Sequence, residues 1–188
     1  MVTIRLERST DAAAREALLD RAYGDVRFDK PSERLRAGRL PADGLSFAAV
    51  EDGRLIGTVR LWHVAAGRDR PALLLGPLAV APDHQRRGIG ASLMQRALRE
   101  ARRRGHRAVL LVGDAAYYGR FGFSADKSAA LRLPGPCQPE RLLALELIPG
   151  SLDGAKGTMR ATGAPMPQGL PAFLVGPTRT RAAIPRAA

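Results

Sequence analysis

Leu78-Ala-Val-Ala-Pro-Asp-His-Gln-Arg-Arg-Gly-Ile-Gly90 combines an apolar strand, a short turn and a glycine-containing loop that opens a helix. The first turn of a helix leaves backbone N–H groups without partners and lies at the positive end of the helix dipole. Such a loop binds anions, most often phosphate. Arg86 and Arg87 stand in the same loop, so the stretch predicts a site for a phosphorylated ligand.

The segments on both sides of this loop predict a strand–helix–strand unit. Residues 72–80 are apolar, and residues 91–104 carry apolar side chains on one helical face, with Gly105 as the C-cap. Residues 108–112 predict a second apolar strand. Strands and a helix at this spacing form a right-handed βαβ unit, so the loop lies at the carboxyl end of a parallel strand, where open α/β sheets bind ligands.

The remaining segments predict further elements of the same α/β domain. Residues 47–50 and 55–62 flank an Asp-Gly turn and predict a hairpin. The other expected elements are a strand at 3–8, a helix that starts at Ser9-Thr10-Asp11, a second helix within 27–39, a short helix at 114–120, a strand entered at 121–123 and a last core strand at 142–147.

The C-terminal end differs in composition from the rest of the chain. Five prolines interrupt any periodicity after residue 164. We therefore expect one globular domain over residues 1–163 and a C-terminal arm containing proline and arginine over residues 164–188. An arm of this kind docks on its own body or on a neighbouring subunit, which leaves a homodimer open.

The composition narrows the class of protein. The net charge is +12, but the basic residues are spread along the chain, and their one run, Arg102-Arg103-Arg104, suits the end of a helix. Nucleic acid is therefore a disfavoured partner. The single cysteine, Cys137, excludes an intrachain disulfide, and three scattered histidines give no metal site. Without a signal-like or bilayer-length apolar segment, we expect a cytoplasmic protein with no membrane contact.

Three known phosphate loops can be compared with this one. A P-loop needs Gly-x-x-x-x-Gly-Lys-Ser/Thr, which is absent, and a dinucleotide loop needs a third glycine where this chain has Leu93. The pattern Gln/Arg-x-x-Gly-x-Gly/Ala is matched at every position by Gln85-Arg-Arg-Gly-Ile-Gly90. This loop resembles that of the Gcn5-related N-acetyltransferases, which binds the pyrophosphate of acetyl-CoA.

A second match follows the next predicted strand. The family places a tyrosine just before a Gly-Phe pair, and here Tyr118 precedes Gly122-Phe123 with three residues between. The stretch Gly113-Asp-Ala-Ala-Tyr-Tyr-Gly-Arg-Phe-Gly-Phe123 is most similar to one bacterial subgroup of predicted N-acetyltransferases, as is Leu145-Glu-Leu-Ile-Pro-Gly150. The resemblance covers residues 3–163 and is strongest over 75–123.

The resemblance implies the acyl-CoA N-acyltransferase fold, an α/β fold whose mixed central sheet has splayed parallel strands flanked by helices. It also implies an acetyltransferase that uses acetyl-CoA, without a metal, to acetylate a primary amine. The residues expected to bind the cosubstrate are Leu78, Ala79, Val80, Gln85, Arg86, Arg87, Gly88, Ile89, Gly90 and Ala91.

Two groups are candidates for the chemical step. Proline cannot donate to a strand ladder, so a bulge at Gly76-Pro77 would free the backbone N–H of Leu78 to polarise the acetyl carbonyl. Tyr118 is the candidate general acid for the CoA thiolate, because a phenol near pKa 10 can protonate a thiolate near 8.5.

The general base that receives the amine proton stays unassigned. The 73–80 strand carries no acid, and the candidates are His63, Asp114, Glu33 and Glu51. A missing base also favours an alternative, a catalytically weak acyl-CoA-binding sensor or regulatory module. Small-molecule and protein amines are both open as acceptors, although the positive net charge disfavours polycations.

Overall fold

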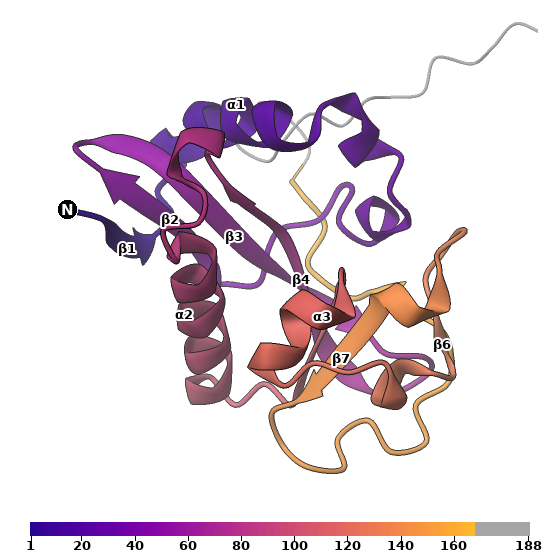
Figure 1. Ribbon diagram of the computed structural model, residues 1–188. Helices are drawn as coiled ribbons and strands as arrows, with labels where there is room; N and C mark the ends of the chain where they lie inside the picture. Colours follow the sequence, from indigo (N-terminus) through magenta and orange to yellow (C-terminus); the bar gives the residue numbers. More distant parts are fainter. Residues whose placement is uncertain (168–188) are drawn as a thin grey trace, which may run out of the picture.

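The computed structural model describes residues 1–167, and these form a seven-stranded sheet with helices packed around it (Figure 1), together with a small two-stranded sheet. The α-helices are α1 (Ala12–Tyr23), α2 (Ile89–Arg103) and α3 (Ala115–Tyr118). The strands are β1 (Thr3–Leu6), β2 (Ser46–Glu51), β3 (Arg54–Ala65), β4 (Pro71–Val80), β5 (Ala108–Val112), β6 (Leu131–Arg132), β7 (Leu142–Glu146), β8 (Gly157–Thr158) and β9 (Arg160–Ala161). The 3₁₀ helices are η1 (Ser9–Asp11), η2 (Asp25–Phe28), η3 (Pro31–Leu35), η4 (Pro82–His84), η5 (Gly119–Phe121), η6 (Asp126–Ser128) and η7 (Pro139–Arg141).

The seven-stranded sheet is mixed, as the sequence predicted. Its order is β1-β2-β3-β4-β5-β7, and β9 pairs with β3 beside this path. The pair β4–β5 is parallel, with α2 as the connection, and the other pairs of this sheet are antiparallel. The predicted βαβ unit is therefore confirmed.

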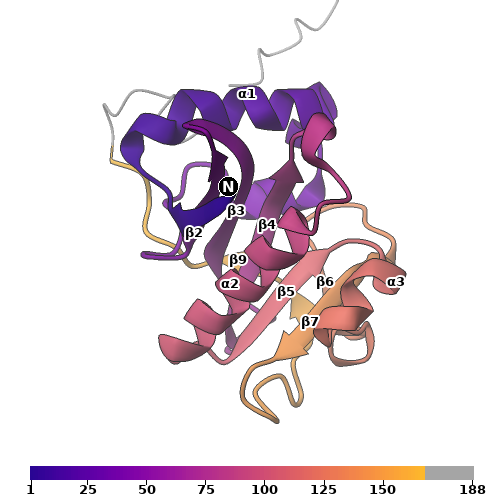
Figure 2. The ribbon, with the colours of Figure 1, turned by 60° about the vertical axis from the view of Figure 1, so that its left-hand side comes forward.

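The core is divided by the sheet into two clusters. Side chains of β4 alternate between them, because successive residues of a strand point to opposite faces. Leu73 and Leu75 pack with the apolar face of α2, whereas Ala72 and Leu74 pack with the second cluster. Figure 2 shows α2 lying across the sheet on the first of these faces. The near-continuous burial of β4 confirms that this apolar run is covered on both sides.

The strands β4 and β5 separate halfway along their length. Their paired residues within the described chain are Leu73 with Val109 and Leu74 with Leu110. Beyond this point β5 stays paired with β7, whereas β4 passes through a bulge in which Gly76 and Pro77 together oppose one residue of β3. The Gly76–Pro77 peptide bond is cis. The bulge and the splayed strands agree with the sequence prediction.

Two predicted elements are wrong. Residues 27–39 contain the 3₁₀ turns η2 and η3 in place of a helix, because Pro31 restricts the residue before it and opens a new turn. No strand begins at 121–123 in the described structure, where η5 ends at Gly122 with φ of +88°. A left-handed residue cannot continue a strand, and the chain rejoins the sheet by one bridge, between Ser124 and Ala144.

The predicted arm begins along the body of the domain. Leu40 N–H donates to the Ala164 carbonyl at 2.9 Å, and Met166 N–H donates to the Gly38 carbonyl at 2.9 Å. The rest of the arm, and its expected role in a homodimer, lies outside the described residues. Among the described helices, none has the length and apolar character to cross a bilayer.

A buried ionic cluster ties the first strand to the sheet beneath the bulge. The Glu7 carboxylate, 5% exposed, accepts from Arg60 Nε at 2.8 Å and also pairs with Arg15, which is 1% exposed. Arg60 is the β3 residue that faces the bulge. One carboxylate therefore compensates two buried guanidinium groups that belong to α1 and β3.

We expect Glu7→Gln to lower the free energy of unfolding by about 3–5 kcal/mol, because within residues 1–167 it leaves the buried Arg60 without an acidic partner and Arg15 with Glu16 alone. Urea denaturation followed by circular dichroism measures this loss. Glu100→Gln is the matched control, since Glu100 pairs with two arginines on the surface of α2, and its loss should be much smaller. Equal losses in the two variants would contradict the assignment of the Glu7 cluster as a central support.

Candidate active site

The predicted phosphate loop connects β4 to α2 with its backbone exposed. After η4, Gly88 forms the N-cap of α2 with φ of +77°, and Arg86 also has a positive φ of 60°. The left-handed conformation at Gly88 favours glycine. The N–H groups of the first turn that follows have no partner within the helix, so they are available to an anion, as the predicted phosphate site requires.

The two arginines of the loop have different surroundings. Arg87 makes a bidentate pair with Glu51 at 2.7 and 3.0 Å, and the Arg87 guanidinium lowers the pKa of that carboxyl. This pair fastens the loop to the β2–β3 hairpin. Arg86 makes no side-chain hydrogen bond or ion pair within residues 1–167. Of the two, Arg86 has its guanidinium free for a bound anion.

The second half of β4 turns backbone polar groups toward the gap. Ala81 N–H donates to the Ile56 carbonyl at 2.8 Å, and the register continues with Ala79 opposite Thr58. Hydrogen-bonded pairs alternate along an antiparallel ladder. Leu78 and Val80 are therefore the residues whose N–H and C=O groups point away from β3 and into the space that β5 leaves.

Two side chains hold the bulge from either side. Trp62 Nε1 donates to the Gly76 carbonyl at 2.6 Å, and the Tyr23 hydroxyl donates to the Leu78 carbonyl. Because the Leu78 carbonyl is occupied by Tyr23, the N–H of Leu78 is the group left facing the gap. The Leu78 N–H is therefore a hydrogen-bond donor held in place where β4 and β5 separate.

Tyr118 lies on the opposite side of the gap, at the end of α3. Asp114 caps this helix by accepting from Ala116 N–H at 2.9 Å. The Tyr118 ring packs edge-on against Tyr117, with 4.9 Å between centroids, and against Phe123 at 6.2 Å. Burial, with a smaller contribution from Tyr23, raises the pKa of Tyr118 to about 12. The phenol therefore keeps its proton throughout the neutral range.

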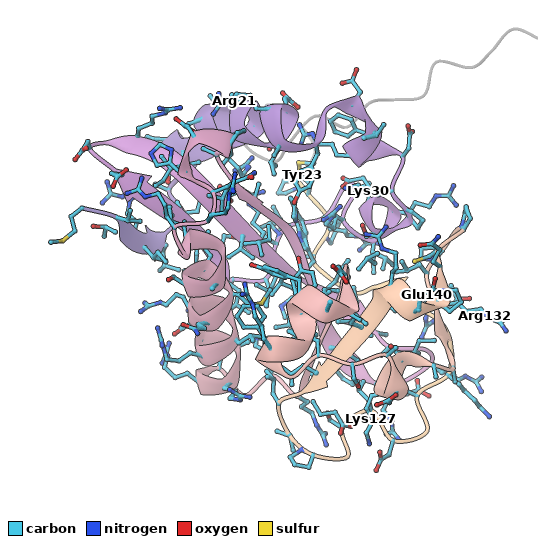
Figure 3. All side chains as sticks on the ribbon, in the orientation of Figure 1. Arg21, Tyr23, Lys30, Lys127, Arg132 and Glu140 are labelled. Atoms are coloured by element: carbon cyan, nitrogen blue, oxygen red, sulfur yellow. The ribbon has the colours of Figure 1, made fainter. Side chains whose placement is uncertain are left out.

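A cavity of about 380 Å³ lies between these groups. Its walls come from the β4 bulge, the end of β5, Tyr23, Tyr118 and the segment before η7. Figure 3 shows Tyr23 and Lys30 on the indigo segment and Glu140 on the orange segment across from it. The charged residues of the wall are all cations: Arg27, Lys30, Arg36 and Arg141.

None of the four candidate bases lines this cavity. His63 lies on β3 with its ring 5.5 Å from His106, and Asp114 caps α3. Glu51 pairs with Arg87, and Glu33 pairs with Arg36 at 2.9 Å. Glu33 contacts the cavity wall through Arg36, which lines it.

The cavity wall contains groups that sequence reasoning missed. Tyr23, Lys30, Arg36 and Arg141 come from segments with no motif, and they meet only because the chain folds over the sheet. Cys137 also lines the cavity, where burial raises the pKa of its thiol.

Comparison with known proteins identifies the family. The family model described as Acetyltransferase (GNAT) family matches residues 13–123. The chain belongs to the GNAT family. The match contains the phosphate loop, the whole βαβ unit and Tyr118. The resemblance that the sequence carried is therefore confirmed, and so is the fold.

Two bacterial GNAT proteins show the extent of the similarity. The uncharacterized N-acetyltransferase YhbS of Escherichia coli K12 is 31% identical over 159 residues, which are 82% of this chain and 92% of YhbS. The crystal structure of E. coli YhbS in complex with CoA matches with a TM-score of 0.72, over 85% of this chain and 89% of that one. A GNAT acetyltransferase of Brucella melitensis in complex with acetyl-CoA is 30% identical, with a TM-score of 0.56, over 81% and 99% of the two chains.

The position of the Tyr118 ring in this GNAT domain depends on a glycine. A Cβ on Gly113 would lie 2.1 Å from Tyr118 Cε2, whereas a Cβ on Gly119 would meet nothing within 4 Å. We expect Gly113→Ala to displace the ring and to lower the free energy of unfolding by about 1–3 kcal/mol, as overpacking does. Gly119→Ala, the control, should change it by less than about 0.5 kcal/mol. Urea denaturation measures the free energy of unfolding of both variants. An unchanged value for Gly113→Ala would contradict this packing.

Proposed function

We propose that the protein transfers the acetyl group of acetyl-CoA directly to a primary amine. The observation that carries this proposal is the gap between β4 and β5, with the Leu78 N–H on one side and the Tyr118 hydroxyl on the other. A thioester needs a donor for its carbonyl oxygen and an acid for its sulfur. The CoA and acetyl-CoA complexes of the two relatives support the identity of the cosubstrate.

The cosubstrate is held by backbone groups more than by side chains. Its pyrophosphate accepts from N–H groups of residues 86–91 at the start of α2, with Arg86 adding a charge-assisted bond. Its pantetheine arm takes the place of a strand beside β4 and bonds to Leu78 and Val80, the residues whose polar groups face the gap. The backbone N–H and C=O groups of Ala79 point toward β3, so Ala79 contributes to cosubstrate binding only by keeping β4 extended.

The reaction is a direct acyl transfer. The neutral amine nitrogen attacks the thioester carbonyl carbon, and the Leu78 N–H donates to the oxygen as its negative charge develops. The intermediate then collapses, the carbon–sulfur bond breaks, and the CoA sulfur leaves with the electron pair. Tyr118 gives its proton to that sulfur and regains one from solvent, while the surplus proton of the former amine passes to water.

The amine must be neutral when it attacks, although a free alkylamine is protonated at neutral pH. A carboxylate in the cavity would take this proton, but the described wall has only cations as its charged groups. Nearby positive charges disfavour an ammonium ion and lower its pKa. We propose that these cations take the place of a general base, and that water receives the proton.

A second candidate is an acyl-CoA-binding sensor with little catalysis. It is favoured by the same observation, the lack of an acid among the described residues of the wall. The two candidates differ in turnover. The sensor would bind acetyl-CoA without releasing CoA thiol in the presence of any amine, whereas the enzyme would release thiol in proportion to amine consumed.

We expect Gly88→Glu to weaken acetyl-CoA binding at least a hundredfold, because it brings a carboxylate into the pyrophosphate site. Gly105→Glu is a matched control at the other end of α2. Gly88 and Gly105 have φ of +77° and +78°, and a Cβ meets nothing within 4 Å at either position. Titration calorimetry measures both. Similar affinities of the two variants for acetyl-CoA would remove the loop from the binding site.

We expect Tyr118→Phe to lower kcat by about 10²–10⁴, the contribution typical of a positioned general acid, with little change in acetyl-CoA affinity. Tyr117→Phe is the control, since Tyr117 stands next to it on the same helix and is not in the cavity wall. Thiol release from acetyl-CoA gives the rate, and calorimetry gives the affinity. Full turnover in the Tyr118 variant would exclude its role as the acid.

A further inference from the structure

The acceptor side of the cavity has an unusual balance of charge. The four cations of the wall come from two segments, 27–36 and the end of η7, and no aspartate or glutamate of residues 1–167 accompanies them in the wall. Arg27 and Arg36 are paired with acids that lie outside the wall. An amine acceptor is itself a potential cation, so Lys30 and Arg141, which have no such partner within residues 1–167, repel it. This repulsion calls for a compensating group on the acceptor.

Arg36 is the innermost of these cations. Its side chain is 8% exposed, and its Nη2 bonds to Glu33 at 2.9 Å and to Ser32 Oγ at 3.4 Å. Nη1 lies 3.5 Å from the point where a Cβ on Gly76 would stand, so it faces the bulge and the cavity. Nε has no hydrogen-bond partner among the described residues. A buried guanidinium with unused donors, aimed into a cavity, is suited to an anionic oxygen.

Lys30 and Arg141 stand nearer the opening, on opposite segments. Neither makes an ion pair within residues 1–167, in contrast to Arg27, which pairs with Glu16 and Asp20 at 2.8 Å. The Lys30 ammonium lies 4.3 Å from the centre of the Tyr23 ring. Partial burial, then the charges of Arg36 and Arg141, lower the pKa of Lys30, which indicates that the three cations are close together.

These cations are separate from the phosphate site of the cosubstrate. No residue of the 82–91 loop lines the cavity, and none of the four cations belongs to that loop. Glu140, the acid next to Arg141 in the sequence, is also absent from the wall. The charges at this end of the cavity are therefore left for the second substrate.

We propose that the acceptor is a small amine that also carries an anionic group, a carboxylate or a phosphate, bound by Lys30, Arg36 and Arg141. This inference rests on the proposed acetyl transfer, whose amine it specifies. The cavity of about 380 Å³ lies in the range of small-molecule pockets. The anion offsets the repulsion by the wall, while the remaining positive charge keeps the amine next to the thioester in its neutral form.

The experiment compares matched amines that differ in the anionic group. Phosphoethanolamine is paired with ethanolamine, and glycine with glycinamide, and kcat/KM is measured by thiol release from acetyl-CoA. We expect the anionic member of at least one pair to be preferred tenfold or more, and the pair that shows it separates phosphate from carboxylate. Equal rates within both pairs, or a preference for the uncharged members or for putrescine, would overturn the inference.

Substitutions of single cations test which of them produce the preference for an anionic amine. Lys30→Gln and Arg141→Gln should each reduce kcat/KM for the preferred anionic amine about tenfold, the value of one charge-assisted hydrogen bond, and should reduce it less for the uncharged partner, so that the preference for the anionic amine falls. Arg21→Gln, an exposed cation outside the wall, is the control and should change neither. Acetyl-CoA affinity should stay the same in all three, and a loss in the Lys30 or Arg141 variant would assign these cations to the cosubstrate.

Binding measurements distinguish a failure of this inference from a failure of the proposed function. Trp62 is the single tryptophan of the chain and donates to Gly76 at the cavity, so its fluorescence reports on ligands there. In the CoA-loaded protein, saturable binding of phosphoethanolamine or glycine, weakened by Arg141→Gln, supports the site even if no amine is acetylated. Absence of binding by either anion overturns it, whereas absence of acetyl-CoA binding overturns the proposed function.

Discussion

The separation of β4 from β5 is the constraint on which the rest of the site depends. Two parallel strands that stayed paired to their ends would have used the N–H groups of Leu78 and Val80 in the ladder. The bulge prevents this, and Trp62 and Tyr23 hold it by bonding to carbonyls on either side of Pro77. The gap is therefore built into the sheet, and we propose that the cosubstrate fills this unsatisfied strand edge.

The acetyl-CoA side of the site could be predicted from the sequence because its proposed function depends on backbone N–H and C=O groups. A strand, a glycine loop and an amphipathic helix have local signatures, so the loop at 85–91, the bulge at Gly76-Pro77 and the position of Tyr118 all follow from the order of residues along the chain. The acceptor side depends on side chains from distant segments. Lys30 and Arg141 share a cavity only through tertiary folding, and the 3₁₀ turns that present Lys30 were mistaken for a helix because polar periodicity is weak in such turns.

The missing base becomes intelligible once the cavity is described. A carboxylate beside the amine would attract the ammonium form and then have to remove its proton. A cationic wall acts earlier, because it disfavours the ammonium before the attack. The cost is weaker binding of any simple amine, and an anionic group on the acceptor would recover that binding. In this proposal, the absence of an acid from the described wall and the surplus of cations in it are two aspects of one electrostatic arrangement.

The same reasoning explains why net charge misleads for this chain. Many of its arginines are neutralised locally, as Arg15 and Arg60 are by Glu7 and as Arg87 is by Glu51. The net charge of +12 already subtracts such pairs and says nothing of where the unpaired cations lie, so a general affinity for polyanions does not follow from it. What decides recognition is where cations are left without partners. Lys30 and Arg141 meet that condition in the cavity that Leu78 and Tyr118 also line, where we propose that the anionic group of the acceptor binds.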